Sequence, residues 1–202
     1  MKSIIVLCGG RSRRMGKDKG SLILNGKPMI IHVLDTVKDI VDEIVLVLRD
    51  QDQIDKYKPI LKDEYPSVKI VTDETKDQGP LIGILTGLLH INSEFAQILP
   101  CDSPFISKSF VLNMFEIAES KKFDAVVPIW DDRHIEPLHS IYKKDTVVVI
   151  RDLIENKKRN VKSLIDSLNV KYVDAEEFDE STMSFRNLNT INDFKNYWNY
   201  LN

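Results

Sequence analysis

The chain has 202 residues, of which 43% are hydrophobic and 29% charged, and its formal net charge is −3. These proportions are typical of a soluble globular protein with a core of its own, and the slightly acidic balance argues against general nucleic-acid binding. No apolar run approaches the roughly 20 residues of a membrane-spanning helix, and the chain enters a strand pattern at once, which leaves no room for a signal peptide. We therefore expect a cytoplasmic protein that does not act at a membrane.

Strand and helix patterns alternate along the first 130 residues. Short apolar runs rich in Ile and Val predict buried strands at residues 4–8, 44–48, 68–72, 96–100 and 124–129. Helical patterns lie between them, at residues 28–40, 52–63, 79–91 and 107–120. Ser107 or Ser109 is the expected N-cap of the last of these helices. This order is typical of a doubly wound α/β fold with a mostly parallel sheet and helices on both faces.

Beyond residue 130 the pattern is mixed. It predicts strands at residues 135–142, 170–173 and 183–188, and helices at residues 146–156, 161–168 and 191–201. We expect this part to extend the sheet as a mixed layer and to cover a ligand. No linker or low-complexity segment divides the chain, so the sequence predicts a single domain over residues 1–202.

The loop after the first strand carries the clearest functional signal. Gly9 and Gly10 leave backbone N–H groups open to close approach. Five cations follow within nine residues: Arg11, Arg13, Arg14, Lys17 and Lys19. Such a cluster at the end of a buried strand indicates a polyphosphate site. The P-loop and the dinucleotide-binding motif are both excluded, because Arg11 stands where each of them requires a glycine.

Further candidates follow later strands, where doubly wound sheets bind ligands. Asp102 is a candidate Mg²⁺ ligand, because one carboxylate together with substrate phosphates commonly holds this ion. The alternative is a turn aspartate that caps backbone N–H groups. Asp73 also follows a strand. Pro80 suits the first position of a helix, in which Gly83 indicates either close approach of a ligand or tight helix–sheet packing.

Other residues have a structural interpretation beside the functional one. His139 is interpreted as a structural histidine, and Arg159, with two lysines before it, as either solvated surface or an anion site. Cys8 and Cys101 are too few for a disulfide scaffold and are expected to be small buried hydrophobic side chains. Asn189 or Thr190 is the expected cap of a final helix. No Ser-His-Asp or Cys-His arrangement is evident.

Ordered motifs across residues 7–190 resemble those of the molybdenum cofactor guanylyltransferase family, which belongs to the α/β nucleotidyltransferases. The motifs are Leu7-Cys8-Gly9-Gly10-x-Ser12-x-Arg14-Met15-Gly16-x-Asp18-Lys19, Gly79-Pro80-Leu81-x-Gly83, Cys101-Asp102-Ser103-Pro104, Glu136-Pro137-Leu138 and Asn187-Leu188-Asn189-Thr190. The resemblance implies a Rossmann-like nucleotidyltransferase fold, with a nucleotide-binding half at residues 1–130 and an acceptor-binding half at residues 131–202. It also implies transfer of GMP from GTP to the terminal phosphate of molybdenum-molybdopterin, with release of pyrophosphate.

The family pattern also implies roles for individual residues. The residues implied to bind GTP are Leu7, Cys8, Gly9, Gly10, Arg14, Lys19, Asp73, Gly79, Gly83 and Asp102. Arg14, Lys19 and Asp102 are the implied catalytic residues, with Mg²⁺ as the cofactor on Asp102. Arg159, Asn187 and Asn189 are the implied molybdopterin contacts. The implied partners are the two substrates and proteins that insert molybdenum or receive the finished cofactor.

Rival functions stay open at this point. One is cytidylyl transfer to the same pterin, another is nucleotidyl transfer to a sugar phosphate, and a third is a non-catalytic GTP-binding or cofactor-carrier protein. Gly9 and Gly10 resemble the guanylyl branch, because cytidylyl relatives tend to carry Ala-Gly there. Two positions depart from the family pattern. Cys8 replaces the usual alanine, and Arg49 falls near a position where some relatives place asparagine.

Overall fold

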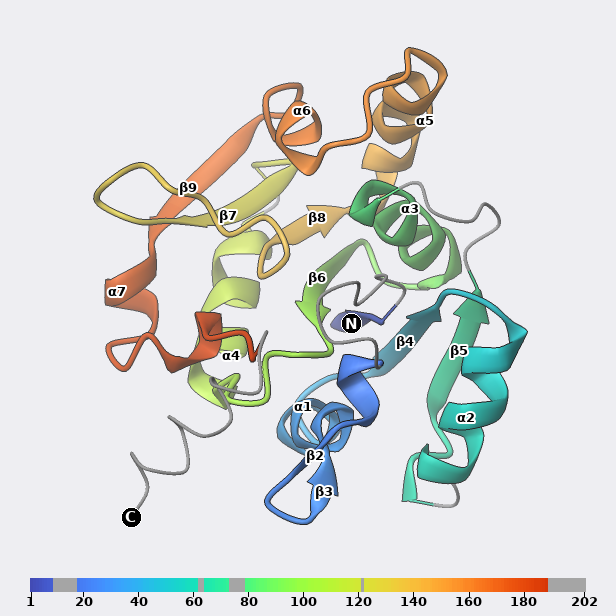
Figure 1. The fold of residues 1–202 in the computed structure, drawn as a ribbon. Helices are drawn as coiled ribbons and strands as arrows, with labels where there is room; N and C mark the ends of the chain where they lie inside the picture. Colours follow the sequence, from blue (N-terminus) through green and yellow to red (C-terminus); the bar gives the residue numbers. More distant parts are fainter. Residues whose placement is uncertain (9–17, 62–63, 73–78, 121, 189–202) are drawn as a thin grey trace.

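A seven-stranded sheet forms the centre of the molecule (Figure 1). The computed structural model describes residues 1–8, 18–61, 64–72, 79–120 and 122–188. The order of strands in the sheet is β5-β4-β1-β6-β8-β7-β9. Their bounds are β1 Ser3–Leu7, β4 Glu43–Leu48, β5 Val68–Thr72, β6 Phe95–Pro100, β7 Ala125–Ile129, β8 Ile141–Lys143 and β9 Val170–Asp174. A separate short hairpin pairs β2 (Ile23–Leu24) with β3 (Lys27–Pro28) through a turn at Asn25 and Gly26, both of which have positive φ.

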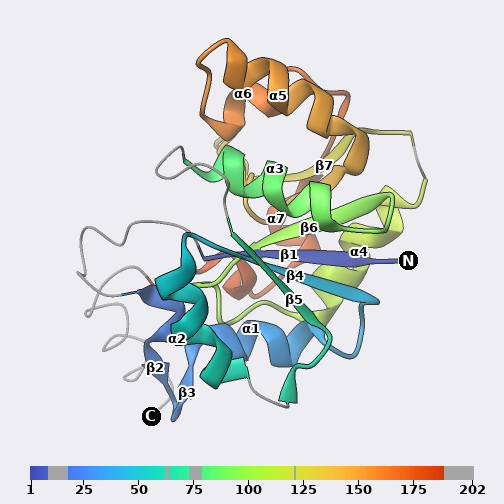
Figure 2. The same cartoon turned by 90° about the vertical axis from the view of Figure 1, so that its right-hand side faces the viewer.

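Helices cover both faces of the sheet (Figure 2). The α-helices are α1 Met29–Val37, α2 Gln51–Leu61, α3 Pro80–His90, α4 Lys108–Ala118, α5 Val147–Glu155, α6 Val161–Ile165 and α7 Ala175–Phe178. Short 3₁₀ turns are η1 Lys19–Ser21, η3 Lys144–Thr146 and η4 Met183–Phe185. Side chains of α1, α2 and α4 form one core cluster with the sheet, and those of α3, α5 and α6 form a second cluster on the opposite face. The doubly wound α/β fold is confirmed.

Local sequence signals explain where two of these helices begin. Ser107 is the N-cap of α4, and its hydroxyl accepts a hydrogen bond from the backbone N–H of Phe110 at 3.1 Å. Pro80 opens α3, as expected. Helix α3 lies very close to strand β1, because a Cβ atom on Gly87 would collide with the side chain of Ile5. This close packing depends on a glycine that the sequence analysis did not single out.

The direction of winding changes between β1 and β6. Strand β1 pairs in parallel with β4 on one side and with β6 on the other. The chain runs outward from β1 through β4 to β5 and then returns to β6, so the carboxyl ends of β1 and β6 lie side by side. In doubly wound sheets this switch point is where ligands bind, outside the carboxyl ends of the strands. The pairing of Leu7 with Pro100 marks its position.

The strand predicted at residues 135–142 is wrong over most of its length, because strand β8 begins only at Ile141. Strand β8 comprises Ile141–Lys143 and lies antiparallel between β6 and β7, inside the sheet rather than beyond it. Residues before it form a turn, in which the backbone N–H of His139 and the hydroxyl of Ser140 both donate to the carbonyl of Glu136. Pro137 has no N–H to offer a neighbouring strand, which is the physical reason that the expected strand does not extend through it.

The prediction of a strand at residues 183–188 is also wrong. Met183–Phe185 form a 3₁₀ turn instead. The carboxylate of Asp179 accepts a hydrogen bond from the backbone N–H of Ser184 at 2.8 Å, and such local side-chain bonds compete with sheet pairing. Helices at 146–156 and 161–168 are confirmed in shorter form by α5 and α6, and the strand at 170–173 by β9. The final helix and its expected caps lie outside the described residues.

Within the described residues, no helix is both long enough and apolar enough to span a membrane.

Candidate functional site

Two predicted catalytic residues meet at the switch point of the sheet. Lys19 begins η1, and Asp102 lies two residues after the end of strand β6. The Lys19 ammonium donates a hydrogen bond to Asp102 Oδ2 at 2.7 Å. The pair is partly buried, with side-chain exposures of 23% for Lys19 and 12% for Asp102. The fold therefore brings together one cation and one carboxylate that are 83 residues apart in the chain.

Backbone contacts hold the Asp102 segment between two parts of the chain. The backbone N–H of Cys101 donates to the carbonyl of Leu7 at 3.1 Å, and that of Leu188 donates to the carbonyl of Asp102 at 3.0 Å. The hydroxyl of Ser103 donates to Oδ1 of Asn187. Asn187, which the family pattern implies as a molybdopterin contact, is thus bonded to the residue next to Asp102, the expected metal ligand.

The two cysteines lie at adjacent strand ends and are buried, as expected. Burial, together with a hydrogen bond to Cys101 and nearby Asp18, raises the pKa of the Cys8 thiol well above its usual value. The thiol therefore stays neutral, and Cys8 packs as a small apolar side chain in the core.

A buried Ser-His-Glu arrangement lies next to Asp102, although none was evident in the sequence. Ser103 Oγ is 3.0 Å from His139 Nε2, and His139 Nδ1 is 3.5 Å from Glu136 Oε2. Burial raises the pKa of Glu136, but the nearby His139 and a hydrogen bond from Trp130 outweigh it and lower this pKa below its ordinary value. Since Ser103 is fully buried and already donates to Asn187, the arrangement connects segments rather than presenting a nucleophile. The structural interpretation of His139 agrees with this geometry.

A second group of predicted residues gathers at the start of α3. Gly79 has φ +83°, a conformation that favours glycine, and a Cβ atom there would lie 3.4 Å from the carbonyl oxygen of Arg159. The carbonyl of Arg159 therefore lies near the entry to α3, while Arg159 itself is exposed. Gly83 is buried within the same helix.

Several predicted residues lie outside the described part of the chain: Gly9, Gly10, Arg14, Asp73 and Asn189. Arg49, where a base contact was uncertain, is described. Its Nε donates to Asp50 Oδ2 at 2.8 Å, and its backbone N–H donates to Gln53 Oε1 at 2.7 Å. These two contacts hold Arg49 against the start of α2.

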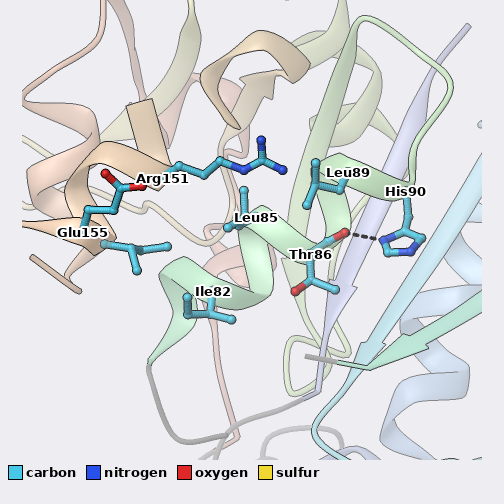
Figure 3. Close-up of a pocket in the computed structure, with 8 residues that line it drawn as sticks. Ile82, Leu85, Thr86, Leu89, His90, Arg151 and Glu155 are labelled. Carbon is cyan, nitrogen blue, oxygen red and sulfur yellow. Dashed lines mark hydrogen bonds between the residues drawn. The ribbon is translucent and has the colours of Figure 1, made fainter. Parts of the chain in front are cut away.

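A largely apolar groove of about 210 Å³ lies elsewhere, between α3 and α5 (Figure 3). Its lining includes Leu85 and Leu89 of α3, Ile154 of α5 and the charged residues Arg151 and Glu155. None of the predicted site residues belongs to its lining. The groove and the Lys19–Asp102 pair are therefore separate features.

Sequence comparison assigns the family. The model of a family described as the MobA-like NTP transferase domain matches residues 4–172. The chain belongs to this family. It is thus a nucleotidyltransferase, and the family expected from the motifs is confirmed.

Curated relatives share almost the whole length of the chain. A protein of Methanothermobacter thermautotrophicus named "Probable molybdenum cofactor guanylyltransferase" is 39% identical over 197 residues, which cover 96% of this chain and 98% of the relative. A protein of Methanosarcina mazei with the same name is 36% identical, with 96% and 89% covered.

Solved structures agree with the fold. One titled as molybdopterin-guanine dinucleotide biosynthesis protein A from Archaeoglobus fulgidus has a TM-score of 0.82 at 29% identity, with 97% of this chain and 96% of that chain covered. A nucleotidyl transferase from Methanothermobacter has a TM-score of 0.76 at 20% identity, with 99% and 97% covered, and supports the fold alone.

Proposed function

We propose that this chain transfers GMP from GTP to the terminal phosphate of molybdopterin carrying molybdenum. The products are the guanine dinucleotide form of the cofactor and pyrophosphate. The observation that carries the choice of substrates is the 39% identity, over 96% of the chain, to a relative named as a molybdenum cofactor guanylyltransferase. The Lys19–Asp102 pair at the switch point supports the place of the reaction.

The bond changes need few chemical groups from the protein. A phosphate oxygen of the pterin attacks the α-phosphorus of GTP, a P–O bond forms there, and the bond to the β-phosphate breaks. A phosphate nucleophile is already ionised at neutral pH, so no general base is required. Such transfers depend chiefly on positioning and on neutralising charge. The ammonium of Lys19 suits the second task, because it can neutralise negative charge on the leaving pyrophosphate.

Asp102 suits the binding of a divalent cation together with phosphates. Among the residues that the structure describes, no cluster of three or more His, Cys, Asp or Glu side chains could enclose a metal. Asp102 would supply one carboxylate, and phosphates and water would supply other ligands, which fits the coordination habits of Mg²⁺. A cation bound there would neutralise phosphate charge and orient the α-phosphate.

The acceptor half of the proposal rests on contacts made by residues 131–202. Asn187 is hydrogen bonded to Ser103, one residue from Asp102, and the carbonyl of Arg159 lies near Gly79. Two segments of the second half thus lie against the proposed nucleotide-binding residues. The exposed Arg159 carries a positive charge that suits an anionic pterin phosphate.

The experiment that tests this function offers two nucleotides to the same acceptor. Purified protein is incubated with molybdenum-loaded molybdopterin, Mg²⁺ and either GTP or CTP, and the products are identified by mass spectrometry. We expect a guanine dinucleotide and pyrophosphate from GTP, and little product from CTP. Product from CTP alone would contradict the proposal and favour cytidylyl transfer. The same protein with sugar 1-phosphates in place of the pterin tests the remaining rival.

A further inference from the structure

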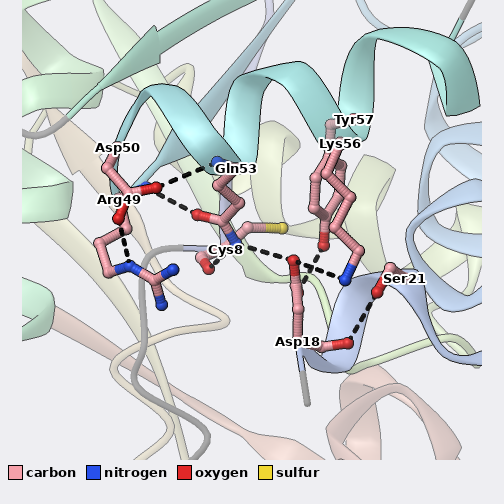
Figure 4. A network of polar contacts seen from close by, with 8 residues as sticks. All are labelled: Cys8, Asp18, Ser21, Arg49, Asp50, Gln53, Lys56 and Tyr57. Carbon is pink, nitrogen blue, oxygen red and sulfur yellow. Dashed lines mark hydrogen bonds and ion pairs between the residues drawn. The ribbon is translucent and has the colours of Figure 1, made fainter.

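One side chain of α2 contacts the residues at both ends of the glycine- and cation-rich loop at residues 9–17, called the phosphate loop below. Cys8 and Asp18 flank residues 9–17. Gln53 Nε2 donates to the carbonyl of Cys8 at 2.9 Å and to Asp18 Oδ2 at 3.1 Å (Figure 4). Gln53 is only 4% exposed. Both hydrogens of its side-chain amide are therefore used to hold together two points of the chain that are ten residues apart.

The orientation of the Gln53 amide is fixed by its other atoms. Its Oε1 accepts from the backbone N–H of Arg49 at 2.7 Å, and its own backbone N–H donates to Asp50 Oδ1 at 3.0 Å. Rotation of the amide by 180° would place its NH₂ group against the Arg49 N–H and lose all three side-chain bonds. Gln53 thus has one arrangement that satisfies its buried polar atoms.

Asp18 receives further bonds from the same helix. Tyr57, which is fully buried, donates its hydroxyl to Asp18 Oδ1 at 2.8 Å, and Lys56 Nζ lies 3.7 Å from Asp18 Oδ2. Burial, with contributions from both cysteines and Asp18, raises the pKa of Tyr57 far above its ordinary value, so its hydroxyl stays a donor. A Cβ atom on Gly20 would collide with this hydroxyl. The first turn after the loop is therefore packed directly onto Tyr57.

We propose that Gln53 and Tyr57 are positioning residues for nucleotide binding. Through Asp18 they hold the end of the phosphate loop so that the next residue, Lys19, lies at Asp102. Gln53 also fixes the other end of the loop at Cys8. The proposal rests on the proposed function insofar as Lys19 binds the triphosphate. Because α2 is a three-turn helix packed on the sheet, it supplies a rigid support for both loop ends.

The chain offers a matched control for removing the Tyr57 hydroxyl. Tyr65, 5% exposed, donates its hydroxyl to Asp35 Oδ1 at 2.6 Å, so Tyr65→Phe also removes one buried phenol bond to an aspartate. Affinities for Mg²⁺-pyrophosphate, GTP and CTP are measured by calorimetry for both variants, along with melting temperatures. Both variants are expected to melt at lower temperature. Tyr57→Phe alone is expected to bind pyrophosphate and GTP at least about fivefold more weakly.

A double-mutant cycle separates positioning from general stability. If Tyr57 acts through Lys19, Tyr57→Phe has no further effect on pyrophosphate affinity in a Lys19→Met background. A purely structural role would lower stability in both backgrounds and leave pyrophosphate affinity unchanged. If Tyr57→Phe does not fold, Asp18→Asn, which keeps the shape of the side chain, replaces it in the same comparison.

The outcomes distinguish this proposal from the proposed function. Equal pyrophosphate affinities of the Tyr57→Phe and Tyr65→Phe variants, within about twofold, would refute the positioning role and leave the guanylyl assignment intact. Wild-type preference for CTP, with weaker CTP and pyrophosphate binding by Tyr57→Phe, would refute the guanylyl assignment and support the positioning role. A wild-type protein that binds none of the three ligands would overturn both.

Discussion

Replacing Lys19 by Met should strengthen the binding of a divalent cation to Asp102 when no nucleotide is present. In the structure the ammonium of Lys19 lies 2.7 Å from the carboxylate on which the cation is proposed to bind. Opposite unit charges at this distance attract each other by about 1.5 kcal/mol even at the dielectric constant of bulk water, about 80. That energy corresponds to about tenfold in affinity. Because the two side chains are largely buried, the effective dielectric constant between them is lower than in bulk water. About tenfold is therefore the lower limit of the expected increase in cation affinity.

Mn²⁺ titration followed by electron paramagnetic resonance measures this affinity directly. The matched control is Lys162→Met, since Lys162 also lies 2.7 Å from a carboxylate, that of Asp166, but with exposures of 71% and 56%. The control should change Mn²⁺ affinity by less than about twofold, because exposed pairs contribute little. GTP affinity should fall in Lys19→Met and not in the control. Unchanged or weaker Mn²⁺ binding by Lys19→Met would refute the idea that lysine and metal compete for Asp102.

Three predictions concern the fold around the site. Gly87→Ala should lower the free energy of unfolding by about 1–3 kcal/mol in urea titration, because the new Cβ collides with Ile5; an unchanged value would mean that α3 shifts freely. For Asp35, burial raises the pKa, but hydrogen bonds from a tyrosine and two lysines outweigh it and lower the pKa below its ordinary value. The stabilisation of the folded state by ionised Asp35 is therefore fully present above about pH 4. It is lost as the pH falls through the lower pKa that Asp35 has in the folded state. Asp35→Asn should thus reduce the melting temperature at pH 7 more than at pH 2.5, and equal losses would contradict this sign. Ser103→Ala should cost about 1–3 kcal/mol in urea titration by leaving His139 Nε2 without its partner, and a cost near zero would show that the histidine finds another.

The parallel half of the fold could be predicted because its strands are buried on both faces. Such strands read as continuous apolar runs, and Ile4, Ile44 and Ile98, in three neighbouring strands, are all almost fully buried. The helices between them carried clear start signals, such as Ser107 and Pro80. The rule that ligands bind beyond strand ends singled out the loop that ends at Lys19 and the segment that contains Asp102. In the structure these two side chains lie 2.7 Å apart.

The second half was harder to predict because short polar contacts decide its structure. The mixture of apolar and polar residues before and after Pro137 resembles a strand of mixed polarity, but the turn there is held by hydrogen bonds to the carbonyl of Glu136. In the same way Asp179 captures the N–H of Ser184 and favours a 3₁₀ turn. Local patterns do not specify such partners, because each contact depends on which residues the fold brings together.

The polar network around Gln53 could not have been found from spacing. Nothing in the sequence of α2 shows that a glutamine would bridge Cys8 and Asp18, which are 45 and 35 residues away along the chain. Its burial and its three side-chain bonds become visible only when strands β1 and β4 are placed side by side.

The fate of labelled phosphates tests the central claim most directly. The protein is incubated with Mg²⁺, molybdopterin carrying molybdenum, and GTP labelled at either the α- or the γ-phosphate. Guanylyl transfer at the Lys19–Asp102 site predicts that the α-label appears in the pterin dinucleotide and the γ-label in pyrophosphate, with Asp102→Asn losing both products. Transfer of the γ-label to the pterin, or its release as free phosphate with GDP, would contradict the account.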